Sequence, residues 1–230
     1  DFKQVLEIVP TAPELENDPG DVATKGSALA GAALCKSIEA CRKWCADNPS
    51  SSTWPSSNAK TIDPKLTKKI PNTHGVKNSS YSRGTDDMLA GLANAGRIAK
   101  NKNPNYSIHV RSGFRPLKTQ IRLVCDKYKS GSESEIKKVG SIVAFPGGSN
   151  HGSGAAIDVQ LWEGGKKIVT SSSKTQNQPQ YKEPAKIFAE IMAEAGFVRY
   201  AKEIWHFELE GQASSKCRCK GSACPFPPKC

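Results

Sequence analysis

Apolar and polar positions in the second half of the chain follow the periods of helices and strands. Residues 85–100 carry apolar side chains on one face at helical spacing, and Thr85 is a candidate N-cap. Gly196 follows a second stretch of this kind as a candidate helix stop. The pattern predicts helices over residues 85–100 and 184–195 and strands over 106–111, 155–162, 197–200 and 204–209. Because helices lie before and between antiparallel hairpins, we expect an α+β fold rather than a doubly wound sheet.

The flanking segments differ in composition from this region. Residues 1–84 hold an acidic, proline-containing start, a helix-like stretch with three cysteines over 23–46, and a long run rich in Ser, Pro, Asn and Lys. Residues 211–230 are basic and hold four cysteines. We therefore predict an N-terminal extension over 1–84, a domain with the candidate chemistry over 85–210, and a cysteine-rich basic tail over 211–230.

The composition of the 230 residues is that of a soluble protein, with 37% hydrophobic and 24% charged residues. No run approaches the roughly 18 apolar residues of a transmembrane helix, so we predict no membrane span. The net charge of +11 favours polyanionic surroundings such as nucleic acid, an anionic membrane or an acidic cell-wall polymer. No nucleic-acid-binding motif accompanies the charge, so we expect no nucleic-acid partner.

Eight cysteines are present, and four of them fall in the last 14 residues. An even number clustered in this way favours disulfides formed in an oxidising compartment, although eight positions do not reveal the pairing. A structural zinc site in the tail is the alternative, but the spacing fits no paired C-x2-C knuckle. The chain begins at Asp1, and we expect a mature extracytoplasmic form, secreted or periplasmic, whose signal peptide has been removed.

Two of the four histidines lie in surroundings that favour a metal centre. His151 is flanked by glycines and small residues, which leave its imidazole accessible. Asp158 lies in an apolar strand, where a buried carboxylate needs a partner. His206 lies in the last predicted strand, three residues after Glu203. A lone histidine is ordinarily a core or loop residue, but together these residues match a catalytic zinc ion with three ligands, an open position for water and a nearby proton carrier.

A turn at residues 112–116 links the strand over 106–111 to a further predicted helix. Arg115 in this turn is a candidate for holding a carboxylate or a developing oxyanion. The alternative is an ordinary exposed arginine in a turn.

Three motifs in order along the chain point to a known family. They are Ser112-Gly113-Phe114-Arg115-Pro116 with Gln120, then Ser149-x-His151-x-x-Gly154-x-Ala156-x-Asp158, and then Glu203-x-Trp205-His206. The set resembles the zinc D-alanyl-D-alanine carboxypeptidases of the VanY/VanX type, peptidase family M15, over residues 85–210. The resemblance implies the hedgehog/D-Ala-D-Ala-peptidase fold, an α+β domain with a small antiparallel sheet and flanking helices. It does not extend to residues 1–84 or 211–230, which we expect to be disulfide-rich elaborations.

The resemblance also implies roles for the residues that match the motifs. One catalytic zinc ion would be held by His151, Asp158 and His206, with Glu203 as general base and acid and Arg115 as the group that stabilises the oxyanion. Ser149, Gln120 and Trp205 would contact the substrate.

The function implied by the resemblance is hydrolysis of the terminal D-Ala-D-Ala bond of peptidoglycan stem peptides by metal-activated water. Two alternatives stay open: an endopeptidase that cuts within the stem or a cross-link, and a non-catalytic, zinc-stabilised wall-binding module. Glu203 and Arg115 speak against the second alternative, because a structural zinc site needs neither. The basic tail makes anionic cell-wall polymers a further candidate partner.

Overall fold

The computed structural model describes residues 61–78, 80–116, 119–120, 122–124, 143–144, 148–213 and 217–230. Thr61–Pro116 and Asn150–Cys230 form one compact unit, and Asp1–Lys60 with Leu117–Ser149 are grouped in a second. The predicted helix over 23–46 and its three cysteines lie outside the described residues. The sheet and the predicted metal ligands belong to the first unit, whereas the described helical residues 119–120 and 122–124 belong to the second.

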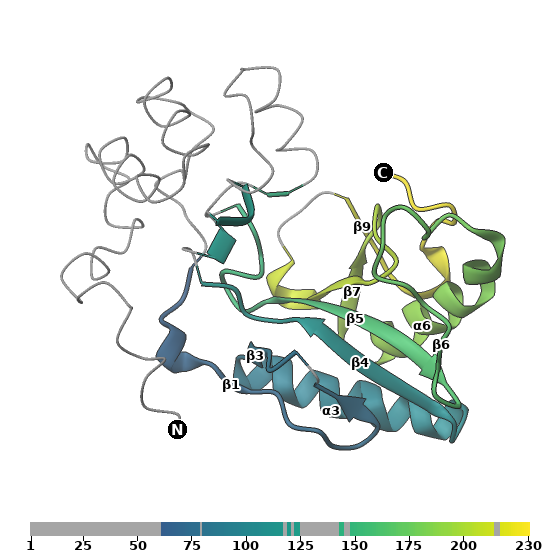
Figure 1. The fold of residues 1–230 in the computed structure, drawn as a ribbon, viewed down its shortest axis with the longest axis horizontal. Helices are drawn as coiled ribbons and strands as arrows, with labels where there is room; N and C mark the ends of the chain where they lie inside the picture. The colour runs from purple at the N-terminus through teal and green to yellow at the C-terminus, as the bar shows by residue number, and fades with distance from the viewer. Residues whose placement is uncertain are drawn as a thin grey trace, which may run out of the picture. The chain divides into compact units, whose positions relative to one another are not determined.

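A largely antiparallel sheet organises the first unit (Figure 1). Among the described residues its strands follow the order β2-β4-β5-β8-β7-β9, and β6 pairs with β5. The β2–β4 pair is parallel, and the other described pairs are antiparallel. The strands of this sheet are β2 (Val76–Lys77), β4 (Tyr106–Ser112), β5 (Ala156–Glu163), β6 (Lys166–Lys167), β7 (Phe197–Tyr200), β8 (His206–Leu209) and β9 (Arg218–Cys219). A separate antiparallel pair consists of β1 (Lys68–Lys69) and β3 (Arg83–Gly84). Short 3-10 helices are η3 (Pro64–Leu66), η4 (Pro179–Tyr181), η5 (Glu210–Gln212) and η6 (Gly221–Ala223).

The described part of this unit contains the α-helices α3 (Asp86–Lys102) and α6 (Lys182–Glu194). Thr85 caps α3 as predicted, because its side-chain oxygen accepts a hydrogen bond from the backbone N–H of Met88 at 3.3 Å. Gly196 follows α6 with a φ of +89°, a conformation that glycine adopts without strain. α3 packs against β4, α6 packs against β7, and the two helices contact each other.

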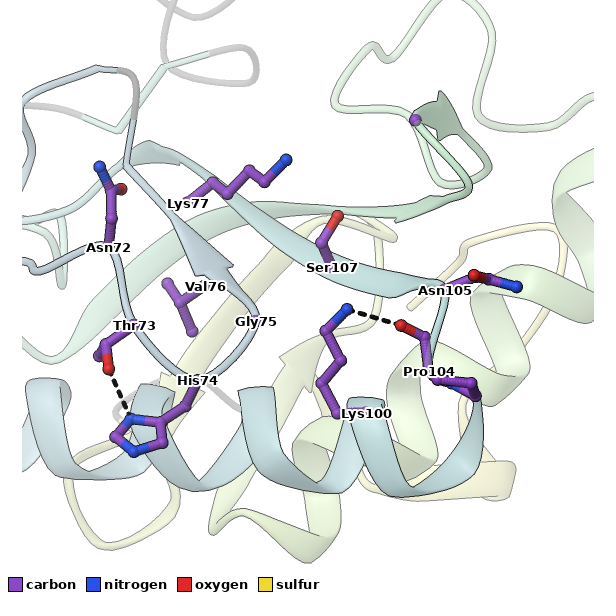
Figure 2. Close-up of a pocket in the computed structure, with 11 residues that line it drawn as sticks. Asn72, Thr73, His74, Gly75, Val76, Lys77, Lys100, Pro104, Asn105 and Ser107 are labelled. Atoms are coloured by element: carbon purple, nitrogen blue, oxygen red, sulfur yellow. Dashed lines mark hydrogen bonds between the residues drawn. The ribbon is translucent and has the colours of Figure 1, made fainter.

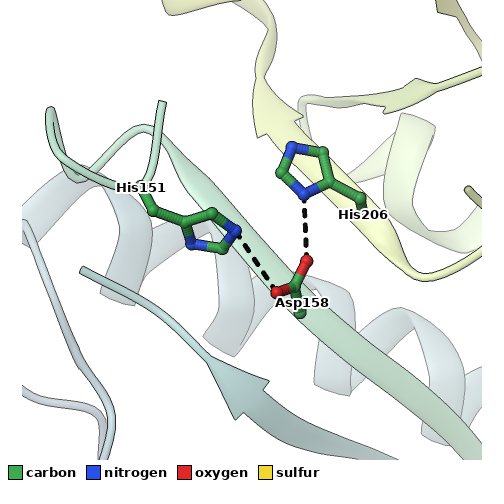
Figure 3. Close-up of side chains that lie close together, drawn as sticks. All are labelled: His151, Asp158 and His206. Carbon is green, nitrogen blue, oxygen red and sulfur yellow. Dashed lines mark hydrogen bonds and ion pairs between the residues drawn. The ribbon is translucent and has the colours of Figure 1, made fainter. Parts of the chain in front are cut away.

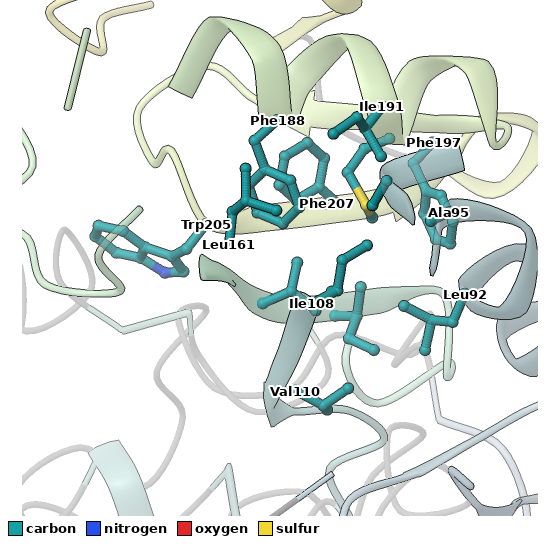
Figure 4. Close-up of a cluster of buried hydrophobic side chains, with 14 of the residues drawn as sticks. Leu92, Ala95, Ile108, Val110, Leu161, Phe188, Ile191, Phe197, Trp205 and Phe207 are labelled. Atoms are coloured by element: carbon teal, nitrogen blue, oxygen red, sulfur yellow. The ribbon is translucent and has the colours of Figure 1, made fainter. Parts of the chain in front are cut away.

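Both helices contribute to one hydrophobic core on a single face of the sheet (Figure 4). Phe188 of α6 meets Phe207 of β8 edge to face, with ring centroids 5.1 Å apart. Asp158 points to the opposite face, because side chains alternate along a strand. The residues of β5 that join the core are Ile157, Val159 and Leu161. The sheet therefore has an apolar face beneath the helices and a second face that carries Asp158.

Strand pairing holds the C-terminal tail against the sheet, and two disulfides cross-link the tail internally. β9 pairs with β7. Cys217 is bonded to Cys230, and Cys219 is bonded to Cys224. For these four cysteines the prediction of disulfides is confirmed, and the alternative of a zinc site in the tail is wrong because the thiols bond to one another. The other four cysteines lie outside the described residues.

The prediction of an α+β fold is confirmed, and the helices predicted over 85–100 and 184–195 and the strands predicted over 106–111, 155–162, 197–200 and 204–209 begin and end within two residues of their observed bounds. The sheet also takes up β2, which precedes residue 85, and β9, which follows residue 210. The domain boundaries at 84/85 and 210/211 stay a prediction. No helix among the described residues has the length and apolar character needed to cross a membrane.

We expect Phe188→Ala to lower the free energy of unfolding by about 3–5 kcal/mol, because this fully buried side chain would leave a cavity between α6 and β8. Urea denaturation of the oxidised protein measures the change. Lys186→Ala, at an exposed position of the same helix, is the matched control and should change stability by less than about 0.5 kcal/mol. An equal effect of the two substitutions would contradict the described core.

Candidate metal centre

The register of β5 and β8 places a carboxylate beside an imidazole on the face of the sheet away from the helices. Asp158 and His206 are direct partners across the two strands. Asp158 Oδ1 lies 2.9 Å from His206 Nδ1 (Figure 3). Phe207, the next residue of β8, packs into the core, so strand alternation directs His206 to this face.

His151 approaches the same carboxylate from a turn that precedes β5. Its Nε2 lies 3.3 Å from Asp158 Oδ2. Its Nδ1 donates a hydrogen bond to the carbonyl oxygen of Gly113 at 2.8 Å, since a carbonyl can only accept. The backbone N–H of Arg115 donates to the carbonyl oxygen of His151 at 3.0 Å. These two bonds join the first motif to the second.

Glycine is required at two positions where these segments pack closely. A Cβ on Gly113 would lie 2.3 Å from the carbonyl oxygen of Arg83, so no side chain fits there. Gly154 has a φ of +71°, and a Cβ on it would lie 2.8 Å from Thr85 Cγ2. Both glycines belong to the sequence motifs, and both permit the close packing that brings His151 to Asp158.

His151, Asp158 and His206 form a group that could hold a metal ion, with one ligand atom of each residue within 4.8 Å of the others. The second nitrogen of each imidazole already has an acceptor, which is Gly113 for His151 and Glu208 for His206. An imidazole that donates from one nitrogen presents a lone pair at the other, so both rings direct a ligand atom toward Asp158. Two imidazoles and a carboxylate suit a zinc ion.

The three ligand candidates have strongly perturbed pKa values. Burial raises the pKa of Asp158, but the adjacent imidazoles, His151 foremost, outweigh burial and hold it well below its usual range. Burial lowers the pKa of His151. Burial also lowers the pKa of His206, but hydrogen bonds to Asp158 and Glu208 outweigh it and raise the pKa to about 9. In the metal-free site His206 therefore holds a proton that a metal ion has to replace.

Two further charged side chains border the group. Glu203 Oε2 lies 4.0 Å from His206 Nδ1, and 32% of the Glu203 side chain is exposed. Burial raises the pKa of Glu203, which brings it closer to the range of a base that acts near neutral pH. Arg115 Nη2 lies 3.7 Å from Asp158 Oδ2 and donates to Ser112 Oγ at 3.0 Å. The structure thus brings together all five residues predicted as metal ligands or catalytic groups.

Residues 90–212 match the model of the family described as VanY, D-alanyl-D-alanine carboxypeptidase. The match spans more than half of the chain and includes the whole group described above. The chain belongs to this family. The resemblance inferred from the three motifs is confirmed, and with it the prediction of an enzyme of the carboxypeptidase class. A search of curated proteins finds no match.

Solved structures with similarity to this chain include three carboxypeptidases or pentapeptidases. The LdcB LD-carboxypeptidase, described in terms of peptidoglycan recognition, is 21% identical, with 66% of this chain and 71% of that chain covered and a TM-score of 0.48. The zinc-bound VanY D,D-pentapeptidase variant of a VanB-type resistance cassette is 17% identical, with coverages of 67% and 89% and a TM-score of 0.42. VanYB in complex with D-alanine-D-alanine is 17% identical, with coverages of 67% and 87% and a TM-score of 0.43.

The three residues predicted to contact substrate are all buried. Trp205 lies in the hydrophobic core of the family domain and not in the group around Asp158. Gln120 donates a hydrogen bond to the carbonyl oxygen of Ala144. Gln120 and Ser149 both belong to the second compact unit. Substrate contact by these three residues stays a prediction.

Glu208 and Arg218 extend the polar network and were not predicted from the sequence. Glu208 accepts a hydrogen bond from His206 Nε2 and pairs with Arg218. The signal for Glu208 was its position two residues after His206, which puts both side chains on one face of a strand. Arg218 had no comparable signal, because the pairing of β9 with β7 decides where it lies.

A hollow of about 500 Å³ lies at the start of β4 (Figure 2). Ser107 lines it, whereas Ser112 at the other end of β4 is the residue that pairs with Asp158. Lys100 in this hollow donates a hydrogen bond to the carbonyl oxygen of Pro104 at 2.6 Å. None of the predicted site residues lines the hollow, so it is not part of the candidate metal centre.

We expect the His206 imidazole of the chelator-treated protein to titrate near pH 9, followed by NMR of its ring signals. Because this pKa exceeds the usual histidine pKa of 6.5, the contribution of His206 to the stability of the metal-free fold is fully present below pH 6.5 and is lost as the pH rises through about 9. His109 is the internal comparison, since burial and the nearby charge of Lys77 lower its pKa. A His206 pKa at or below that of His109 would contradict the described network.

Proposed function

We propose that this chain is a zinc-dependent D,D-carboxypeptidase that hydrolyses the terminal D-Ala-D-Ala bond of peptidoglycan stem peptides. The observation that carries the proposal is the group of two histidines and an aspartate bordered by Glu203 and Arg115, within a chain of the D-alanyl-D-alanine carboxypeptidase family. A structural metal site needs neither a bordering base nor a bordering cation. The arrangement therefore supports catalysis over a non-catalytic wall-binding module.

The zinc ion would be held by Nε2 of His151, the carboxylate of Asp158 and Nδ1 of His206. With three protein ligands, the ion would keep a position open for water. When bound, zinc polarises the peptide carbonyl and lowers the pKa of its water to about 7. Gly113 and Glu208 hold the two imidazoles in the orientation that ligation needs, because each accepts the N–H that does not face Asp158.

Glu203 would act first as general base and then as general acid. Its carboxylate lies at the border of the ligand group and remains partly exposed, so substrate and water have access to it. It takes a proton from the attacking water and delivers that proton to the amine nitrogen of the departing D-Ala. Burial raises the pKa of Glu203, and this favours the first step because a carboxylate of higher pKa is a stronger base.

Arg115 would stabilise the negative charge that develops on the scissile carbonyl oxygen. Its backbone is hydrogen-bonded to His151, and its side chain is hydrogen-bonded to Ser112, so the guanidinium is held beside Asp158 before substrate arrives. A cation that is already in place needs little reorganisation when the charge develops, which is the main advantage of electrostatic catalysis.

We propose an extracytoplasmic location, where peptidoglycan is found. The two disulfides of the tail support this location, because disulfides persist in oxidising compartments. Anionic cell-wall polymers are a further proposed partner, since the net charge of the chain is +11.

We expect Glu203→Gln to keep one zinc ion per chain and to lower kcat by about 10²-fold or more, because the proton carrier is lost while the ligands remain. His206→Ala is the contrasting variant and should lose both zinc and activity. Elemental analysis and turnover of a stem pentapeptide measure the two properties. Activity of Glu203→Gln near that of the unsubstituted protein would remove Glu203 from its role, and full zinc content in His206→Ala would overturn the ligand set.

The proposed function is tested by mass spectrometry of a stem pentapeptide and of cross-linked muropeptides after incubation with the protein, with and without a zinc chelator. We expect chelator-sensitive loss of one terminal alanine from the pentapeptide. A cut inside the stem or the cross-link would instead establish an endopeptidase. Zinc binding without any product would favour the non-catalytic wall-binding module.

A further inference from the structure

A second buried carboxylate lies behind His206, on the side away from Asp158. Glu208 follows two residues later on β8 and faces the same side of the sheet. Its side chain is 1% exposed, and its Oε1 lies 3.1 Å from His206 Nε2. A carboxylate buried to this degree is costly unless it is paired, and a second cation contacts Glu208 besides His206.

Arg218 of β9 is that cation. Its Nε donates to Glu208 Oε2 at 2.7 Å and its Nη2 donates to Oε1, so the guanidinium grips both carboxylate oxygens. The guanidinium carbon of Arg218 also lies 4.8 Å from the centroid of the Tyr200 ring. The Tyr200 ring in turn meets the His206 ring edge to face at 5.9 Å. Arg218 thus contacts two residues that both contact His206.

The backbone that carries Arg218 is fixed on both sides. Its neighbours Cys217 and Cys219 are each disulfide-bonded within residues 217–230, the segment that we name the C-terminal clasp. β9 is paired with β7, and the Nη1 of Arg218 donates to the carbonyl oxygen of Cys217 at 3.0 Å. The clasp lies beyond residues 90–212, which match the family model. A segment outside the family match therefore reaches the network around a metal-ligand candidate.

The contact between Glu208 and His206 decides how the imidazole is presented. When Nε2 carries the proton and donates to Glu208, the lone pair of Nδ1 is directed at Asp158. A carboxylate partner of this kind fixes the ring orientation and the tautomer of a metal-ligating histidine. Arg218 binds both oxygens of Glu208, and Asn150 forms a further hydrogen bond to it. Removal of Arg218 would therefore leave the carboxylate, and with it the ring, less firmly oriented.

We propose that Arg218 is a positioning residue of the metal centre: acting through Glu208, it fixes the tautomer and orientation of His206, and it makes the C-terminal clasp part of the catalytic apparatus. The inference rests on the zinc site of the proposed function.

Three variants of the full, oxidised chain test the inference. Arg218→Met removes the guanidinium and retains most of the side-chain length, and Arg218→Lys retains the charge without the two-pronged grip. Lys220→Met is the matched control, because Lys220 forms an exposed ion pair with Glu210 at 2.7 Å in the same clasp. The zinc dissociation constant is measured by competition with a chromogenic chelator. The tautomer of His206 in the zinc-bound protein is measured by long-range ¹H–¹⁵N NMR.

We expect Arg218→Met to weaken zinc binding by about 10–100-fold and to lose the single His206 tautomer, with Arg218→Lys intermediate and Lys220→Met unchanged. A merely structural role would lower the thermal midpoint while zinc affinity and tautomer stayed as in the unsubstituted protein, and that result would overturn the inference. If Arg218→Met does not fold, Arg218→Lys decides by the same two measurements. Absence of zinc binding by the unsubstituted protein would overturn the proposed function itself. Equal zinc affinities of Arg218→Met and the unsubstituted protein would overturn only the inference about Arg218 and leave the proposed zinc site standing.

Discussion

The carboxylate of Asp158, held between the imidazoles of His151 and His206, is the interaction on which the rest of the site depends. Burial disfavours the charge on this group, and the two rings outweigh burial and keep it ionised. The three residues come from a turn and two different strands, so the group exists only when the β5–β8 pairing and the preceding turn are both formed. The catalytic potential of the chain is thereby tied to one tertiary arrangement.

One face of the sheet carries the hydrophobic core, and the other carries the candidate metal ligands. On β8, Phe207 enters the core beneath α6, while His206 and Glu208 point to the other face. A shift of β8 by one residue would exchange these positions, exposing an aromatic ring and burying two ionisable groups against the helices. The helix-facing core therefore fixes the register, and the register places the ligands. Asp158 and His206, whose pKa values are strongly shifted, therefore alternate along their strands with fully buried apolar side chains.

The polar network continues outward from the metal-ligand candidates in layers. Asp158 contacts His206, His206 contacts Glu208, and Glu208 is gripped by Arg218. The two residues beside Arg218 are each disulfide-bonded, so covalent bonds flank the outermost residue of the network. Around His151 the same task falls to the backbone carbonyl of Gly113, at a position where a Cβ would collide with Arg83. A backbone carbonyl thus orients the His151 ring, whereas a side-chain carboxylate orients the His206 ring.

The sequence by itself determined the class of fold, most helix and strand bounds, and five candidate site residues that the structure brings together around Asp158. Periodicity defined β5 and α6, and the unusual placement of Asp158 in an apolar strand marked a carboxylate that needed partners. What the tertiary structure decided was which side chains support those residues. Arg218 reaches Glu208 only because β9 pairs with β7, and Trp205 lies in the core rather than beside the ligands. Local spacing reveals which face of a strand a residue occupies, but contacts between strands far apart in the chain depend on a register that only the folded sheet establishes.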